Sequence, residues 1–129
     1  MKNVMPYLWV GAGGFLGAIA RYVVANVARK LLGVGFPYGT FFINVSGSFL
    51  LGVILTALAQ RALPHSNEIR LAAAVGFLGA YTTFSTFEYE CHGLLEDREW
   101  ALAVTNMFGS LFLGLLAVRL GMALARQWA

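Results

Sequence analysis

Four long uncharged segments dominate the hydrophobic pattern of this chain. They cover residues 4–28 (interrupted only by Arg21), 31–60, 71–87 and 100–118. An α-helix crosses a hydrocarbon core of about 30 Å in about 20 residues, so each segment is long enough for one span. The pattern therefore predicts an all-α membrane protein with four transmembrane helices, at about residues 7–28, 38–60, 71–95 and 100–124.

The boundaries of these helices follow from local signals. Gly33, Gly35 and Pro37 interrupt the start of the second segment, and proline is tolerated best in the first turn of a helix, so we expect this helix to begin near Tyr38. The connections, about 29–37, 61–69 and 96–99, are too short to fold alone. We therefore expect residues 1–129 to form a single four-helix transmembrane domain.

The composition supports a membrane location. Hydrophobic residues make up 59% of the chain and charged residues 12%, about half the charged fraction of a soluble domain, which is roughly 25%. The net charge of +3 is small and scattered, so we expect no nucleic-acid partner. Cys91 is the only cysteine, which excludes an intrachain disulfide. No nucleophile–base pair, phosphate loop or zinc motif is present, and we expect no enzymatic activity.

The distribution of basic residues specifies the membrane orientation only weakly. With four spans, five Lys or Arg residues fall on the side of the termini and three on the other; these are Lys2, Arg61, Arg70, Arg119 and Arg126 against Arg29, Lys30 and Arg98. Short-loop Lys and Arg residues set orientation, and this bias is modest. The chain therefore inserts either with one fixed topology or in both directions.

Arg21 is a charged residue within the first span. A charge at the centre of a membrane costs about 2.5–3.5 kcal/mol on insertion scales, so Arg21 faces water, a partner or an anion, or extends to the interface as an anchor. Gly13 and Gly17 precede it at four-residue steps. They indicate a face for close helix packing that ends in a cation.

Polar residues recur along one face of the second and fourth helices. Asn44 lies in the second helix among small residues, and Asn106, Ser110 and Gly114 follow each other at four-residue steps in the fourth. Such residues either line a narrow polar track or hydrogen-bond to a neighbouring helix.

The third span contains a hydroxyl-rich segment, Thr82-Thr83-Phe84-Ser85-Thr86-Phe87. Hydroxyl side chains compete for backbone carbonyls, and two glycines precede them, so the segment predicts a broken helix. The ring edges of Phe84 and Phe87 are electropositive and are able to hold an anion without a formal charge, although simple packing is the alternative. At the end of this span, Glu88 and His92 are spaced to meet as a local pair or to contribute to a metal site.

Three strings of this sequence resemble the Fluc (CrcB) fluoride-channel family. They are Gly14-Phe15-Leu16-Gly17-Ala18-Ile19-Ala20-Arg21-Tyr22, Gly39-Thr40-Phe41-Phe42-Ile43-Asn44-Val45-Ser46-Gly47 and Gly79-Ala80-Tyr81-Thr82-Thr83-Phe84-Ser85-Thr86-Phe87-Glu88-Tyr89-Glu90. The Thr-Thr-Phe-Ser-Thr-Phe run together with the Gly-Thr…Asn run is highly specific. The resemblance extends over the whole chain, with four spans in the same order.

The resemblance implies a passive, fluoride-selective channel that lets fluoride leave the cytoplasm and so relieves its toxicity. It implies an antiparallel, dual-topology homodimer in the inner (plasma) membrane, embedded in the lipid bilayer. The implied anion-pathway residues are Asn44, Phe84, Phe87, Ser110, Asn106, Thr83 and Arg21. It also implies a structural sodium ion at the dimer interface, held by the backbone carbonyls of Gly79 and Thr82.

One position departs from the family pattern. Some members have Thr one turn after the fourth-helix serine, where this chain has Gly114.

A small dual-topology, proton-coupled exporter is the alternative function. It needs a membrane-embedded carboxylate, and the first two spans contain no Asp or Glu. A membrane scaffold that transports nothing is a third possibility.

Overall fold

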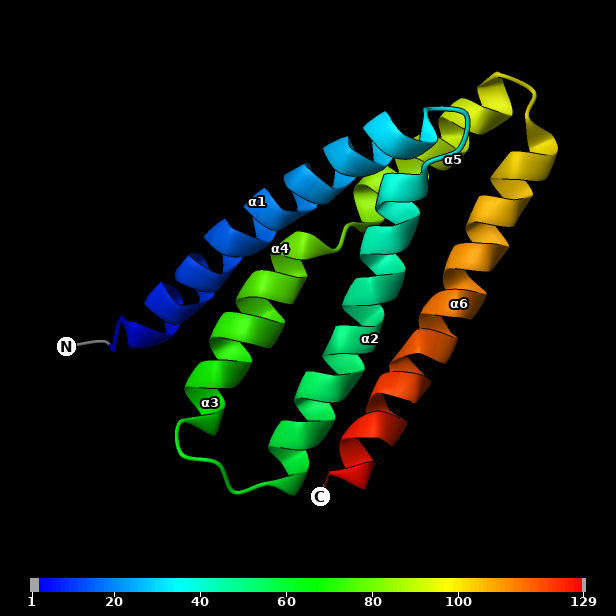
Figure 1. Ribbon diagram of the computed structural model, residues 1–129. Coiled ribbons are helices and arrows are strands. Elements are labelled where there is room, and N and C mark those ends of the chain that lie inside the picture. The colour runs from blue at the N-terminus through cyan, green and yellow to red at the C-terminus, as the bar shows by residue number, and fades with distance from the viewer. Residues whose placement is uncertain (1–2, 129) are drawn as a thin grey trace.

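The computed structural model describes residues 3–128, and within them it consists of helices without strands (Figure 1). Three helices are long and apolar enough to cross a membrane: α1 (Met5–Leu32), α2 (Tyr38–Gln60) and α6 (Trp100–Gln127). Lys2, one of the residues in the orientation argument, lies outside the described residues.

The third hydrophobic segment forms a composite element. It consists of α3 (Ser66–Ile69), the π-helical segment η1 (Arg70–Leu78) and α4 (Gly79–Tyr81), which run on from one another, followed by α5 (Phe84–Glu96). Thr82 and Thr83 between α4 and α5 have extended backbone angles (φ −78°, ψ 158° and φ −152°, ψ 122°). The predicted helix break is therefore present, and it divides this segment into pieces shorter than the three long helices.

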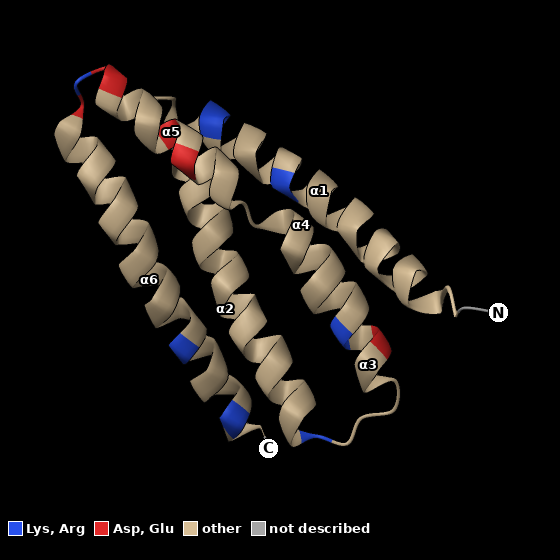
Figure 2. Ribbon diagram, turned by 180° about the vertical axis from the view of Figure 1, so that it is seen from behind, with Lys and Arg blue, Asp and Glu red and all other residues tan. Residues whose placement is uncertain are grey.

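The helices pack as two neighbouring groups. Helix α2 lies along α6, while α1 lies along η1 and α4 and also contacts α2. The α1–α2 and α5–α6 connections lie at one end of the bundle, and the α2–α3 connection lies near the C-terminal end of α6 at the other (Figure 1). Charged residues gather toward these two ends, and α2 carries none along its whole length (Figure 2).

Glycines bring the paired helices close together. A Cβ atom on Gly121 of α6 would overlap the Phe49 carbonyl of α2, and one on Gly52 of α2 would overlap the Val118 carbonyl of α6. A Cβ atom on Gly17 of α1 would likewise overlap the Phe77 carbonyl of η1. Removing the side chain lets the backbones approach, which is how helices gain packing energy in a membrane.

Most large apolar side chains point outward. The buried core is a small cluster of Ile43, Leu78 and Tyr81, whereas Phe15 and Phe112 are each more than two-thirds exposed. Lipid favours such an exterior, and so does a partner subunit. The bundle is therefore a thin, lipid-adapted unit with little interior of its own.

The glycine contacts predict how substitutions affect stability. Gly121→Ala should lower the free energy of unfolding by about 1–3 kcal/mol, because the added methyl group overlaps the α2 backbone. Gly11→Ala is the matched control, since its Cβ would meet nothing within 4 Å. Thermal unfolding of both variants in the same detergent tests this, and equal midpoints would contradict the packing role of Gly121.

Candidate functional site

The helix break is held by a side-chain amide from another helix. Asn44 of α2 donates through Nδ2 to the Thr83 carbonyl at 2.9 Å, and its Oδ1 accepts from the Thr83 N–H at 2.9 Å. One amide therefore satisfies both backbone groups of a residue that has left the helix. Such groups survive at membrane depth only when protein or water pairs with them.

The break also redirects the hydrogen bonds around it. In a continuous helix the N–H of Thr83 would donate to the Gly79 carbonyl and that of Thr86 to the Thr82 carbonyl. Here the first donates to Asn44, and the second donates to the Thr83 hydroxyl, which caps α5. The carbonyls of Gly79 and Thr82 are therefore released from their usual helical donors.

A groove of about 580 Å³ opens beside the break, between α2, the broken segment and α6. Its polar lining comes from three elements and includes Asn44 and Ser48 of α2, Thr82 and Thr83 at the break, Glu88 of α5 and Ser110 of α6. Its apolar lining includes Leu51, Leu78, Phe84, Phe87, Met107 and Leu111. Five of the seven predicted anion-pathway residues thus share one groove: Asn44, Thr83, Phe84, Phe87 and Ser110. The two predicted sodium ligands, Gly79 and Thr82, line it as well.

The two phenylalanines lie at the start of α5. Their ring centroids are 5.9 Å apart and the planes are tilted by 41°. Phe84 is 74% exposed in the single subunit, while Phe87 is half-buried. The pair therefore lines the groove and also projects beyond it.

Asn106 occupies a different place from its predicted neighbours. Asn106 is 1% exposed, and it is not among the described residues that line the groove. Its Oδ1 accepts from the Ser110 hydroxyl at 3.2 Å, and its Nδ2 donates to Cys91 Sγ at 3.2 Å. Asn106 therefore stands behind Ser110. Arg21 is half-buried on α1, and it too is not among the described residues that line the groove.

Gly114 leaves space in the polar track. A Cβ atom there would lie 3.7 Å from Ser48 Oγ, an ordinary van der Waals distance. Ser48 of α2 also lines the groove, so a hydroxyl is present on the facing helix where α6 has none. Beside Gly114 the nearest hydroxyl therefore comes from α2 and not from α6.

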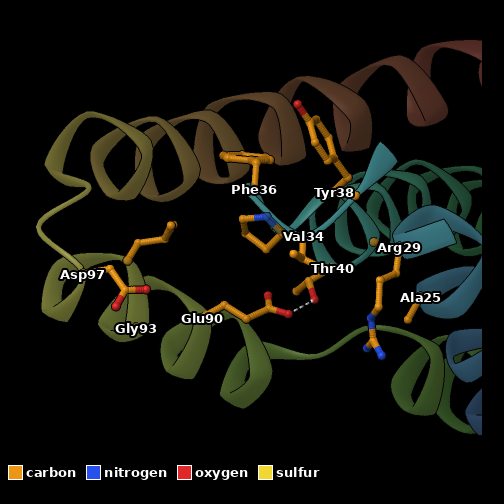
Figure 3. A pocket seen from close by; sticks show the side chains of 13 residues that line it. Ala25, Arg29, Val34, Phe36, Tyr38, Thr40, Glu90, Gly93 and Asp97 are labelled. Carbon is orange, nitrogen blue, oxygen red and sulfur yellow. Dashed lines mark hydrogen bonds between the residues drawn. The ribbon is translucent and has the colours of Figure 1, made fainter. Parts of the chain in front are cut away.

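A second cavity, of about 300 Å³, lies near the α1–α2 connection (Figure 3). Glu90 of α5 accepts a hydrogen bond from the Thr40 hydroxyl of α2 at 2.9 Å, and Arg29, Tyr38 and Asp97 also line this cavity. The sequence contains both Thr40, one turn before Asn44 in the second span, and Glu90, at the end of the third span, but no local spacing connects them.

The charged residues at the end of α5 pair differently from the predicted arrangement. His92 lies 3.5 Å from the carboxylate of Glu96, one turn onward, and not beside Glu88, one turn back. Glu88 instead lines the groove. Both candidate partners are one helical turn from His92, so spacing alone does not distinguish them.

Comparison with known proteins identifies the family. A family model described as CrcB-like protein, Camphor Resistance (CrcB), matches residues 8–122. The chain is 50% identical over 123 residues to a protein of Acidobacterium capsulatum named fluoride-specific ion channel FluC, covering 95% of this chain and 98% of that one. Proteins with the same name from Solibacter usitatus (42% over 95% of this chain and 100% of the relative) and Thermus thermophilus (48% over 92% of each) are similar to it as well. This four-segment helical chain, with its broken third segment, belongs to the CrcB family.

Proposed function

We propose that this chain is a fluoride-selective channel of the bacterial inner membrane, through which fluoride leaves the cytoplasm passively. The observation that carries the proposal is the groove beside the helix break, where amide, hydroxyl and aromatic groups from three elements converge. Family membership and the names of the relatives, fluoride-specific ion channel FluC, support the same ion. The protein is a transporter and not an enzyme.

The chemistry of the groove suits a small anion. Fluoride is strongly hydrated, so a pathway needs hydrogen-bond donors that replace water without holding the ion too tightly. Asn44 has a second amide hydrogen besides the one donated to Thr83. The ring edges of Phe84 and Phe87 add positive potential without a formal charge, which keeps binding weak.

We propose four membrane spans, the third being the broken segment, and an antiparallel homodimer of two oppositely inserted copies. The open groove and the outward-pointing Phe84 support a partner subunit, because a single thin bundle leaves that ring 74% exposed. The weak charge bias between the two ends supports insertion in both directions.

A structural sodium ion fits the chemistry of the break. The Gly79 and Thr82 carbonyls are released from their helical donors, and carbonyl oxygens are the ligands that a hard cation prefers. In an antiparallel dimer, these carbonyls from both copies would hold the ion. When bound, it would supply positive charge beside an anion pathway.

Fluoride efflux from liposomes that contain only this protein tests the function. With equal pH on both sides, and with potassium and valinomycin present to balance the charge, an electrode should record rapid fluoride release, whereas chloride release under the same gradient should stay near that of protein-free liposomes. A proton-coupled exporter would also release fluoride down its gradient, but it would move protons in a fixed ratio to fluoride. Proton movement in such a ratio, beyond that of protein-free liposomes, would therefore contradict the channel.

Asn44→Ala should slow fluoride efflux by about tenfold or more. It removes an amide that lines the groove and leaves both backbone groups of Thr83 without their partner, each worth about 1–3 kcal/mol when buried. Asn67→Ala is the control, because this amide lies at an exposed helix end. Size-exclusion profiles should show that the Asn44 variant still assembles; normal efflux from it would exclude Asn44 from the pathway.

Cysteine labelling tests the dual topology. Asn67→Cys and Glu99→Cys, at opposite ends of the bundle, are introduced separately into a Cys91→Ser background. Each should react from both sides of the membrane, with about half the molecules modified from either side. If each position reacts from one side only, and the two from opposite sides, the chain has a fixed orientation and the antiparallel dimer is wrong.

A further inference from the structure

A chain of three side chains connects a buried thiol to the groove. Cys91 of α5 is 5% exposed and Asn106 of α6 is 1% exposed, and the α5–α6 hairpin brings them together across 15 positions of sequence. Asn106 Nδ2 donates to Cys91 Sγ at 3.2 Å, and Ser110 Oγ donates to Asn106 Oδ1 at 3.2 Å. Ser110, at the other end of this chain, lines the groove.

The direction of these hydrogen bonds matters for an anion. Because the Ser110 hydroxyl donates its proton to Asn106, the serine presents oxygen lone pairs to the groove. Lone pairs repel an anion. If Ser110 simply rotated its proton outward, the Asn106 oxygen would be left buried without a donor, which is unfavourable.

Reversing the Asn106 amide avoids that penalty. With the amide turned by 180°, its NH₂ group donates to Ser110 Oγ and its oxygen accepts from the Cys91 S–H. The Ser110 proton is then free for an anion, and every member of the chain still has a partner. A thiol permits this because it both accepts and donates, weakly in each role, so neither arrangement is strongly favoured.

We propose that Cys91 is a positioning residue for the anion pathway: its thiol is the buried terminus that lets the Asn106 amide reverse and Ser110 turn its proton toward fluoride. The reversal rotates an amide and a hydroxyl group and breaks no covalent bond. This inference rests on the proposed function, since it assigns Ser110 a contact with the permeating ion.

Three variants separate this role from simple packing. Cys91→Ala should slow fluoride efflux by about tenfold, because the reversed Asn106 amide then has no donor for its buried oxygen, whereas the unreversed amide keeps the Ser110 hydroxyl as donor. Cys91→Ser, which keeps a donor and an acceptor, should conduct within about twofold of wild type. In a Ser110→Ala background, Cys91→Ala should slow efflux no further, because the end of the chain that contacts the ion is already absent.

Wild-type efflux by Cys91→Ala would overturn the proposal. So would a Cys91→Ala substitution that slows the Ser110→Ala protein by the same factor as wild type, because that result is typical of a packing defect. Unfolding midpoints and size-exclusion profiles of all variants show which of them retain the fold.

An infrared measurement tests the reversal without relying on transport. Cys91 is the only thiol, so the S–H stretching band of the protein reports this residue alone. Saturating fluoride should move the band to lower frequency as the thiol becomes a donor to Asn106. Chloride should not move it, and Ser110→Ala should abolish the shift.

The two readouts fail independently. Fluoride conduction by a protein whose S–H band does not respond to fluoride would overturn the positioning role and leave the channel intact. A band that shifts with fluoride in a protein that conducts no ion would support the amide reversal and overturn the proposed channel.

Discussion

The pairing of the Asn44 amide with the backbone of Thr83 is the interaction on which the arrangement of the site depends. A helix interrupted in an apolar environment exposes N–H and C=O groups that lipid cannot satisfy. Asn44 pairs with both groups of Thr83 at 2.9 Å, and it comes from α2, which packs on α6. The break is therefore tied to the helices that form the rest of the groove.

The glycines determine whether that amide reaches the break. Gly47 lies one turn after Asn44 on α2, and a Cβ atom there would overlap the Thr82 side chain. Gly52 and Gly121 bring α2 against α6 in the same way. In an environment where apolar burial between helices contributes little, such close contacts determine the spacing. The lack of a side chain at these glycines thus determines where the Asn44 amide lies.

The sequence predicts local features better than contacts between helices. Its hydroxyl-rich third segment indicates a break, which the structure places at Thr82 and Thr83, because local competition for carbonyls depends on neighbouring residues. The four-residue spacing of Asn106 and Ser110 also predicts that both lie on one face of the fourth helix. It does not show that Asn106 turns toward Cys91, because that contact depends on how α5 folds back on α6. The Thr40–Glu90 bond, across 50 positions, escapes prediction for the same reason.

Several of the donors around the groove are already engaged within the protein. Asn44 donates to Thr83, the Thr83 hydroxyl donates to Thr86, and Ser110 donates to Asn106. A protein built to retain an anion would aim unengaged donors at it, and it would release the ion slowly. Here an entering ion must compete with internal partners for these three donors, and each donor can return to its internal partner when the ion leaves. Under the proposed function, this competition keeps each site weak, which is the condition for an ion to pass through and leave.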